Sequence, residues 1–201
     1  VQGILPVAAY ADSAASGGHR LGHAQHIGNK LLPDLWVGRN CQVLQGLLGR
    51  FETAYVMADA IYESTDTFKP DCLWLLAQAA AWMRDRDRLT ATLERHAESM
   101  PAGRYGTVIG ALARGALAAV DGDNDAAIEQ FRVALDEGEK VSDGAELTLA
   151  RLTLAALVGT DHAPAAEAAR AAQAWIDETG TELFRTVFAA GLPATAEAET
   201  A

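Results

Sequence analysis

Equivalent apolar positions recur along the chain at intervals of 35 to 38 residues. A small or apolar residue falls at a matching point between two amphipathic segments four times, at Ala54, Leu89, Ala127 and Ala165. A period in this range is typical of stacked helix pairs, because each pair is one supersecondary unit that buries its apolar face only against its neighbours. The spacing therefore predicts an array of helix pairs, an architecture that binds other molecules far more often than it catalyses reactions.

The composition agrees with an all-α fold. Half of the 201 residues are hydrophobic but only 6% are aromatic. Alanine, the strongest helix former, dominates the hydrophobic set, and β-branched runs typical of strands are almost absent. No segment alternates apolar and polar residues for long enough to indicate a strand. We expect one helical domain over residues 1–191 and a disordered tail over residues 192–201.

Apolar stripes at helical spacing, with proline near their starts and glycine near their ends, divide the chain into four clear pairs. The expected helices cover approximately 33–48 and 51–61, 70–80 and 89–97, 108–118 and 127–135, and 147–157 and 165–176. A weaker helical region precedes them within residues 6–30. A short last helix is expected over residues 182–190.

The third pair resembles the tetratricopeptide repeat family. The residues at that family's spacing are Gly115, Gly122, Ala127, Phe131 and Ala134. The other pairs keep parts of the pattern, with Arg84 in place of the turn glycine in the second pair, so the resemblance covers residues 33–178. It implies a right-handed array of about four to five antiparallel helix pairs with a C-terminal capping helix. The repeats also resemble helical arms of large bacterial regulators, and the 13 arginines against three lysines favour a bacterial source.

The charge of the chain limits the classes of molecule that it can bind, and its cysteines indicate their own chemical state. The net charge of -11 would repel nucleic acid and anionic membrane surfaces. No signal peptide or apolar run of membrane-spanning length is present, so we expect a cytoplasmic protein. Cys41 and Cys72 lie in apolar helical stretches and are expected to be buried thiols, not a disulfide framework.

Two clusters have the spacing of metal ligands. His19, His23 and His26 would share one helical face and could hold a transition metal. The alternative, an exposed polar face, is favoured because glycines interrupt the segment and no acidic residue lies nearby. Asp121, Asp123 and Asp125 begin like a calcium loop, but Ala126 and Arg132 stand where that loop needs glycine and glutamate. We interpret these aspartates as helix-capping residues.

Catalytic motifs are missing from the sequence. It contains no nucleophile elbow, HExxH motif, phosphate-binding loop or dinucleotide fingerprint. We therefore expect neither an enzyme nor a cofactor, and a metal-dependent enzyme built on the histidines is the least favoured hypothesis.

The resemblance implies that the first helix of each pair lines a concave groove. The predicted groove residues are Trp36, Arg39, Val43, Asp71, Trp74, Gln78, Ile109 and Leu112. Toward the C-terminus the same positions form an apolar trough made of Ile109, Leu112, Ala116, Leu147, Ala150 and Leu154. Either the short helix carrying Leu183, Val187 and Phe188 or a second copy of the chain covers this trough, or a partner helix or apolar ligand does. The first explanation is favoured because capping helices commonly end such arrays.

Two functions remain open from the sequence. The main prediction is a non-enzymatic helical-repeat module that mediates protein–protein interaction, with a protein or peptide partner and possible self-association through the apolar trough. The alternative is a ligand- or peptide-sensing arm of a larger bacterial regulator, such as an ATPase, a cyclase or a transcriptional regulator.

Overall fold

The chain folds into α-helices joined by short turns. The computed structural model describes residues 45–100, 102–142 and 144–193, and all regular structure in these ranges is helical. The elements are α3 (Phe51–Ser64), α4 (Lys69–Met83), α5 (Arg86–Ser99), α6 (Arg104–Val120), α7 (Asn124–Gly138), α8 (Gly144–Val158), α9 (Ala163–Thr179), α10 (Glu182–Val187) and the 3₁₀ turn η2 (Ala189–Gly191). The all-α prediction is confirmed. Among these helices, none combines the length and the apolar character needed to cross a membrane.

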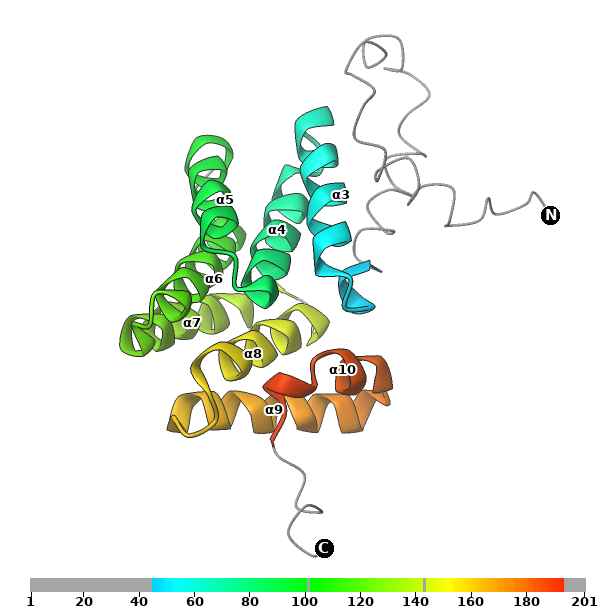
Figure 1. Ribbon diagram of the computed structural model, residues 1–201, viewed down its shortest axis with the longest axis vertical. Helices are drawn as coiled ribbons and strands as arrows, with labels where there is room; N and C mark the ends of the chain where they lie inside the picture. The colour runs from blue at the N-terminus through cyan, green and yellow to red at the C-terminus, as the bar shows by residue number, and fades with distance from the viewer. Residues whose placement is uncertain (1–44, 101, 143, 194–201) are drawn as a thin grey trace, which may run out of the picture.

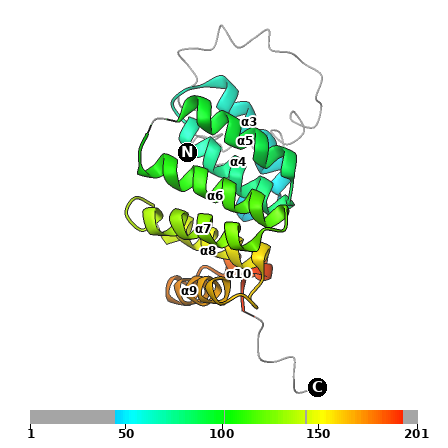
Figure 2. The ribbon, with the colours of Figure 1, turned by 90° about the vertical axis from the view of Figure 1, so that its left-hand side faces the viewer.

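Consecutive helices pack against each other and form a layered array. Figures 1 and 2 show the helices stacked along the long axis, from α3 at one end to α9 and α10 at the other. Within the three pairs that the structure describes, α4–α5, α6–α7 and α8–α9, the helices are in contact, as are α4 with α6, α6 with α8, and α4 with α8. The first helices of these pairs, α4, α6 and α8, therefore contact one another and form an inner layer.

The sequence period is visible in contacts between neighbouring repeats. Among the described residues, polar side chains separated by 35 to 38 residues meet in five places, namely Glu52 with Arg88, Asp59 with Arg95, Tyr62 with Ser99, Arg86 with Asp121, and Asn124 with His162. Residues about one period apart are thus in contact, as expected when each unit stacks on the next.

The turns between paired helices are explained by the backbone conformation and the capping side chains of the residues within them. Arg84 ends α4 with φ 53° in the left-handed region, the conformation that Gly122 adopts with φ 86° in the next pair. Asp85 and Asp123 then cap α5 and α7 by accepting the backbone N–H three residues on, at 3.1 and 3.0 Å. The capping role predicted for Asp123 is confirmed.

The α6–α7 pair is packed closely because one of its facing residues has no side chain. A Cβ on Gly115 would lie 2.8 Å from the ring of Phe131, which is completely buried. Ala127 and Ala134 on the same face of α7 are also buried. The residues that carry the family resemblance are therefore the residues that bring these two helices together.

The C-terminal segment closes one end of the array. Helix α10 ends at Val187, earlier than the expected 190, and packs on α9, while η2 packs on α8. Phe184 and Phe188 are almost completely buried. Gly191 sits so close to α8 that a Cβ there would overlap the carbonyl oxygen of Leu152. This segment therefore packs on the sides of α8 and α9.

Candidate binding pocket

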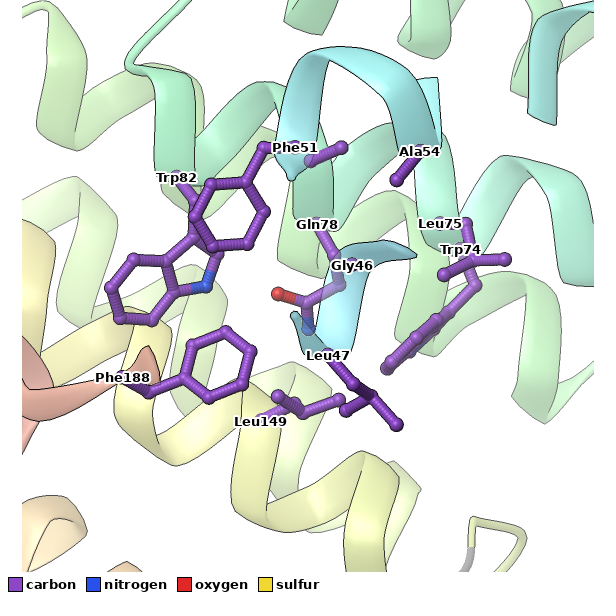
Figure 3. A pocket seen from close by; sticks show the side chains of 11 residues that line it. Gly46, Leu47, Phe51, Ala54, Trp74, Leu75, Gln78, Trp82, Leu149 and Phe188 are labelled. Atoms are coloured by element: carbon purple, nitrogen blue, oxygen red, sulfur yellow. The ribbon is translucent and has the colours of Figure 1, made fainter. Parts of the chain in front are cut away.

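A small apolar pocket lies where the C-terminal segment contacts α3 and α4. Its walls come from the residues before α3 and from α3, α4 and α8, with one residue after α10 (Figure 3). We call it the aromatic pocket; it is lined by Gly46, Leu47, Phe51, Ala54, Trp74, Leu75, Gln78, Ala79, Trp82, Leu149 and Phe188. The space that the centre of a water molecule can reach inside it is about 30 Å³. It is sized for one small group and not for a whole helix.

Three rings form one wall of the aromatic pocket. Phe51 stacks on Trp82 with ring centroids 5.7 Å apart, and Trp82 meets Phe188 edge-on at 4.9 Å. Phe51 and Phe188 are 6.0 Å apart. Such pairs stabilise a fold by about 0.5–1.5 kcal/mol each beyond the area they bury. The wall therefore fixes the C-terminal segment to the first described helix.

A polar network crosses this apolar region and joins α4 to α8. Trp82 Nε1 donates to Thr153 Oγ1 at 3.0 Å, and Thr153 Oγ1 lies 2.8 Å from Gln78 Oε1. Thr153 Oγ1 is also 2.7 Å from the carbonyl oxygen of Leu149. Thr153 has no exposed surface. Because buried polar groups are costly unless they are paired, this network selects one packing of α4 against α8.

One polar atom of this network has no partner. Gln78 is only 6% exposed, and its Nε2 is buried without a hydrogen bond. Figure 3 shows its amide reaching into the space between Phe188 and Trp82 on one side and Trp74 on the other. An unsatisfied buried polar group costs about 1–3 kcal/mol, so folding alone gives no reason to keep it. The amide is available to a group that enters the pocket.

The structure brings two of the predicted groove residues together and separates others. Trp74 and Gln78 line the aromatic pocket, and Asp71 is half-buried in the first turn of α4. Ile109 and Leu112 are completely buried in the core, so their prediction as groove lining is corrected. They are inaccessible because α6 is in contact with α4, α5, α7 and α8.

The apolar trough is likewise not an open surface. Ala116, Ala150 and Leu154 are buried, and Leu147 is half-buried, because the inner helices pack on one another. The remaining predicted residues, Trp36, Arg39, Val43 and the histidines His19, His23 and His26, lie outside the described residues. Within the described ranges, no three metal-ligating side chains are grouped.

Several residues of the aromatic pocket are not among the predicted groove residues. Trp82 could have been found, because Trp74, Gln78 and Trp82 are spaced four residues apart and share one face of α4. Phe188 was expected only in a segment that covers the apolar trough, and Thr153, which is hydrogen-bonded to Trp82 and Gln78 from α8, was not predicted. Their positions depend on how distant helices cross.

A wider groove lies between α7, α8 and α9, and we call it the α7–α9 groove. Its volume on the same measure is about 420 Å³, with apolar residues such as Ile128 and Leu135 below a charged rim. The rim arginines are already paired, Arg132 with Asp136 at 3.2 Å and Arg151 with Glu139 at 3.4 Å. No buried unpartnered atom points into it among the described residues, so the aromatic pocket is the better candidate site.

The charged cluster on α3 and α5 is structural. Arg88 donates to Glu52 at 2.8 Å and lies over the ring of Tyr55 at 4.6 Å. The hydrogen bond from Arg88 lowers the pKa of Glu52, and burial raises the pKa of Tyr55. Each of these charges has a protein partner, so the cluster holds the two helices together.

Comparison of the chain with protein-family models, with curated proteins and with solved structures finds no match. The site must therefore be interpreted from its own geometry.

Proposed function

We propose that this protein is a non-enzymatic helical-repeat module that mediates protein–protein interaction, with tetratricopeptide-like repeats as its scaffold. Its aromatic pocket receives a single anchor side chain from the partner. The observation that carries the proposal is the buried, unpartnered amide of Gln78 inside a pocket walled by aromatic rings. Binding hot spots have this character: a desolvated pocket, aromatic residues and a few polar groups.

The charge of the chain defines the kind of partner. A net charge of -11 favours a neutral or basic protein surface around the anchor and disfavours nucleic acid. The pocket itself has no charged lining residue. The anchor is therefore uncharged, while charges on the rim of the interface affect mainly the rate of association.

Two adjacent leucines provide a matched test. Leu47 lines the aromatic pocket, whereas Leu48 is 42% exposed and does not. We expect the wild-type chain and Leu48→Asp to capture the same protein from a lysate of the source organism, and Leu47→Asp to lose it. With the purified partner, Leu47→Asp should weaken binding by about tenfold or more, because it places a charge in a dry pocket.

Circular dichroism is the control, and it should show the three proteins to be equally helical. The milder Leu47→Ala change keeps the test valid if Leu47→Asp unfolds. Capture that is the same for all variants would refute the proposed site.

One observation favours the ligand-sensing alternative. The pocket wall joins Phe51 at the start of the described array to Phe188 at its end, so a small molecule bound there would act on both ends. In that case a metabolite extract free of protein should raise the melting temperature of the wild-type chain and of Leu48→Asp, but not of Leu47→Asp.

A further inference from the structure

The size of the aromatic pocket limits what it can hold. The space inside it is about 30 Å³. A cavity that holds benzene measures about 150 Å³, whereas one water molecule needs about 10–15 Å³. The pocket therefore has room for about two groups of the size of a water molecule. An aromatic ring, a leucine side chain and a side-chain amide are all too large for it.

The pocket is open on one side, and its polar group lies on the other. Gly46, Leu47, Phe51 and Trp82 are half-buried, while the remaining lining residues, Gln78 among them, are buried. The four half-buried residues therefore border the opening. Figure 3 shows the amide of Gln78 in the midst of the lining side chains. A small group that enters at Leu47 thus meets this amide while apolar side chains surround it.

The unpartnered end of the Gln78 amide is the polar feature that an occupant has to satisfy. One end of the amide lies 2.8 Å from Thr153 Oγ1, and the other is buried without a partner. Rotation of an amide by 180° exchanges its oxygen and nitrogen, so this end is either an acceptor or a donor. A hydroxyl pairs with both, because it donates one hydrogen and accepts through two lone pairs. An ammonium or a carboxylate pairs with one of them only and is charged.

A hydroxyl carried on one carbon satisfies the pocket better than water or a methyl group. Buried water molecules usually have two to four polar partners, and Gln78 contributes one. A methyl group fits but leaves the amide unpartnered. A CH₂OH group covers the apolar walls with its carbon and pairs with the amide through its oxygen. Among side chains, serine consists of these two groups, whereas the thiol of cysteine is only a weak hydrogen-bond partner.

We propose, building on the function above, that the anchor is a serine of the partner protein, whose hydroxyl forms a hydrogen bond with the side-chain amide of Gln78. The serine supplies selectivity, because a partner without the hydroxyl leaves a buried polar group unpaired. The protein surface around the opening supplies most of the contact area. Leu47 borders the opening, which explains why a charge at this position should block the anchor.

Methanol, the side-chain analogue of serine, tests the pocket without knowledge of the partner. Binding to the full chain is followed by two-dimensional NMR through the side-chain amide signals of Gln78 and the indole N–H signal of Trp82. We expect saturable shifts with a dissociation constant between about 10 mM and 1 M, the range open to a ligand of two heavy atoms. The methanol methyl group should show nuclear Overhauser effects to the Gln78 amide hydrogens. tert-Butanol carries the same hydroxyl on a group that is too large and should give neither signal.

Substitution of Gln78 locates the methanol site. Gln78→Leu should weaken methanol binding by about fivefold or more, as followed through Trp82, because the hydrogen bond is lost. Gln173→Leu on α9, a half-buried glutamine outside the pocket, is the matched control and should bind methanol like the wild type. Gln78→Met replaces the leucine variant if that variant does not fold.

A double-mutant cycle with the partner tests the serine itself. Each serine of the partner purified through the Leu47 experiment is replaced by alanine in turn. One of these changes should weaken binding to the wild-type chain by about tenfold and change binding to Gln78→Leu by less than about twofold, because removal of both members of a buried hydrogen bond is nearly neutral. The other serines should show no such coupling to Gln78.

Several outcomes would overturn the proposal. They are methanol shifts that do not saturate, shifts that tert-butanol matches, methanol binding that is unchanged in Gln78→Leu, and the absence of any serine coupled to Gln78. A water molecule that keeps its Overhauser effect to the Gln78 amide at 1 M methanol would show that the pocket is a water site, and would overturn it as well.

The same experiments separate the two proposals. If Leu47→Asp abolishes partner capture but no serine is coupled to Gln78, the interaction site stands and the serine assignment is wrong. If methanol binds through Gln78 but capture is unchanged by Leu47→Asp, the pocket takes a small hydroxyl group and the protein–protein function is wrong.

Discussion

The α6–α7 pair and the junction of α4 with α8 differ in the polarity of the side chains that they bury between the helices. Between α6 and α7 the contact is apolar and close, with Gly115 directly against Phe131. Between α4 and α8 the contact contains the hydroxyl of Thr153, the indole N–H of Trp82 and the amide of Gln78. A small cavity and an unpartnered atom remain there. The first contact repeats the pattern of the array, while the second departs from it.

This difference separates packing that stabilises the fold from packing that leaves a site. A well-filled apolar contact gains from burial and close packing, and any change within it costs stability. A contact with an unsatisfied amide gives up part of that stability, which is a reason to assign it a function. The comparison can be tested by substitutions whose effects on stability should fall in a definite order.

The largest effect is expected in the α6–α7 pair. Phe131→Ala should lower the free energy of unfolding by about 3–5 kcal/mol, because Gly115 cannot extend into the space left by the ring. Val56→Ala on the exposed face of α3 is the control and should change it by less than about 0.5 kcal/mol. Urea unfolding followed by circular dichroism measures both. A loss below about 1 kcal/mol for Phe131→Ala would show that this pair is not the stable part of the array.

The next effect concerns the C-terminal segment. Gly191→Ala places a methyl group on the backbone of Leu152, which cannot move aside, so the segment should detach from α8 at a cost of about 1–3 kcal/mol. Detachment removes Phe188 from Trp82, and the tryptophan fluorescence should shift to longer wavelength. Gly103→Ala, where a Cβ meets nothing, is the control. Unchanged fluorescence in Gly191→Ala would contradict the docked position of the segment.

Within the polar junction, two neighbouring substitutions should differ. Thr153→Val removes the acceptor of the Trp82 indole and should cost about 1–3 kcal/mol. Gln78→Leu removes one hydrogen bond together with an unsatisfied buried group, so stability should fall by less than about 0.5 kcal/mol or rise. Urea unfolding compares the two variants. If Gln78→Leu costs as much as Thr153→Val, the amide is a structural element and the argument for a site fails.

Local features of the fold could be predicted from the sequence, whereas the contacts between helices that are distant in the sequence could not. The helix starts at Pro70 and Asp123 and the close contact at Gly115 follow from residue chemistry within one or two turns. Ile109 and Leu112 were predicted on an open groove because the resembled family exposes these positions of the first helix of each pair. Helix α6 instead has small residues on several sides, which allows neighbours to surround it.

The candidate site shows the same limit. Trp74 and Gln78 were predicted as groove residues from the family resemblance, and both line the aromatic pocket. The wall completed by Phe188 and the network through Thr153 depend on the crossing of α4 and α8, which no local pattern encodes. The lining residues Trp74 and Gln78 of α4 could therefore be predicted from the sequence, whereas the positions of Leu149 and Phe188 depend on tertiary packing.

The smallest effect is expected on the charged face of α3 and α5, where Arg88 pairs with Glu52 and Arg95 with Asp59. Arg88 lowers the pKa of Glu52, so the ion pair stabilises the fold above the ordinary carboxyl range and loses this contribution as the pH falls through the lowered pKa. Glu52→Gln should therefore cost a few tenths of a kcal/mol at neutral pH and low salt, and progressively less as the pH falls below the ordinary carboxyl range or as salt is added. Glu94→Gln, an exposed change on α5, is the control. A difference that persists in acid would mean that Glu52 acts through packing and not through its charge, and would make this face resemble the α6–α7 contact more than a solvated ion pair.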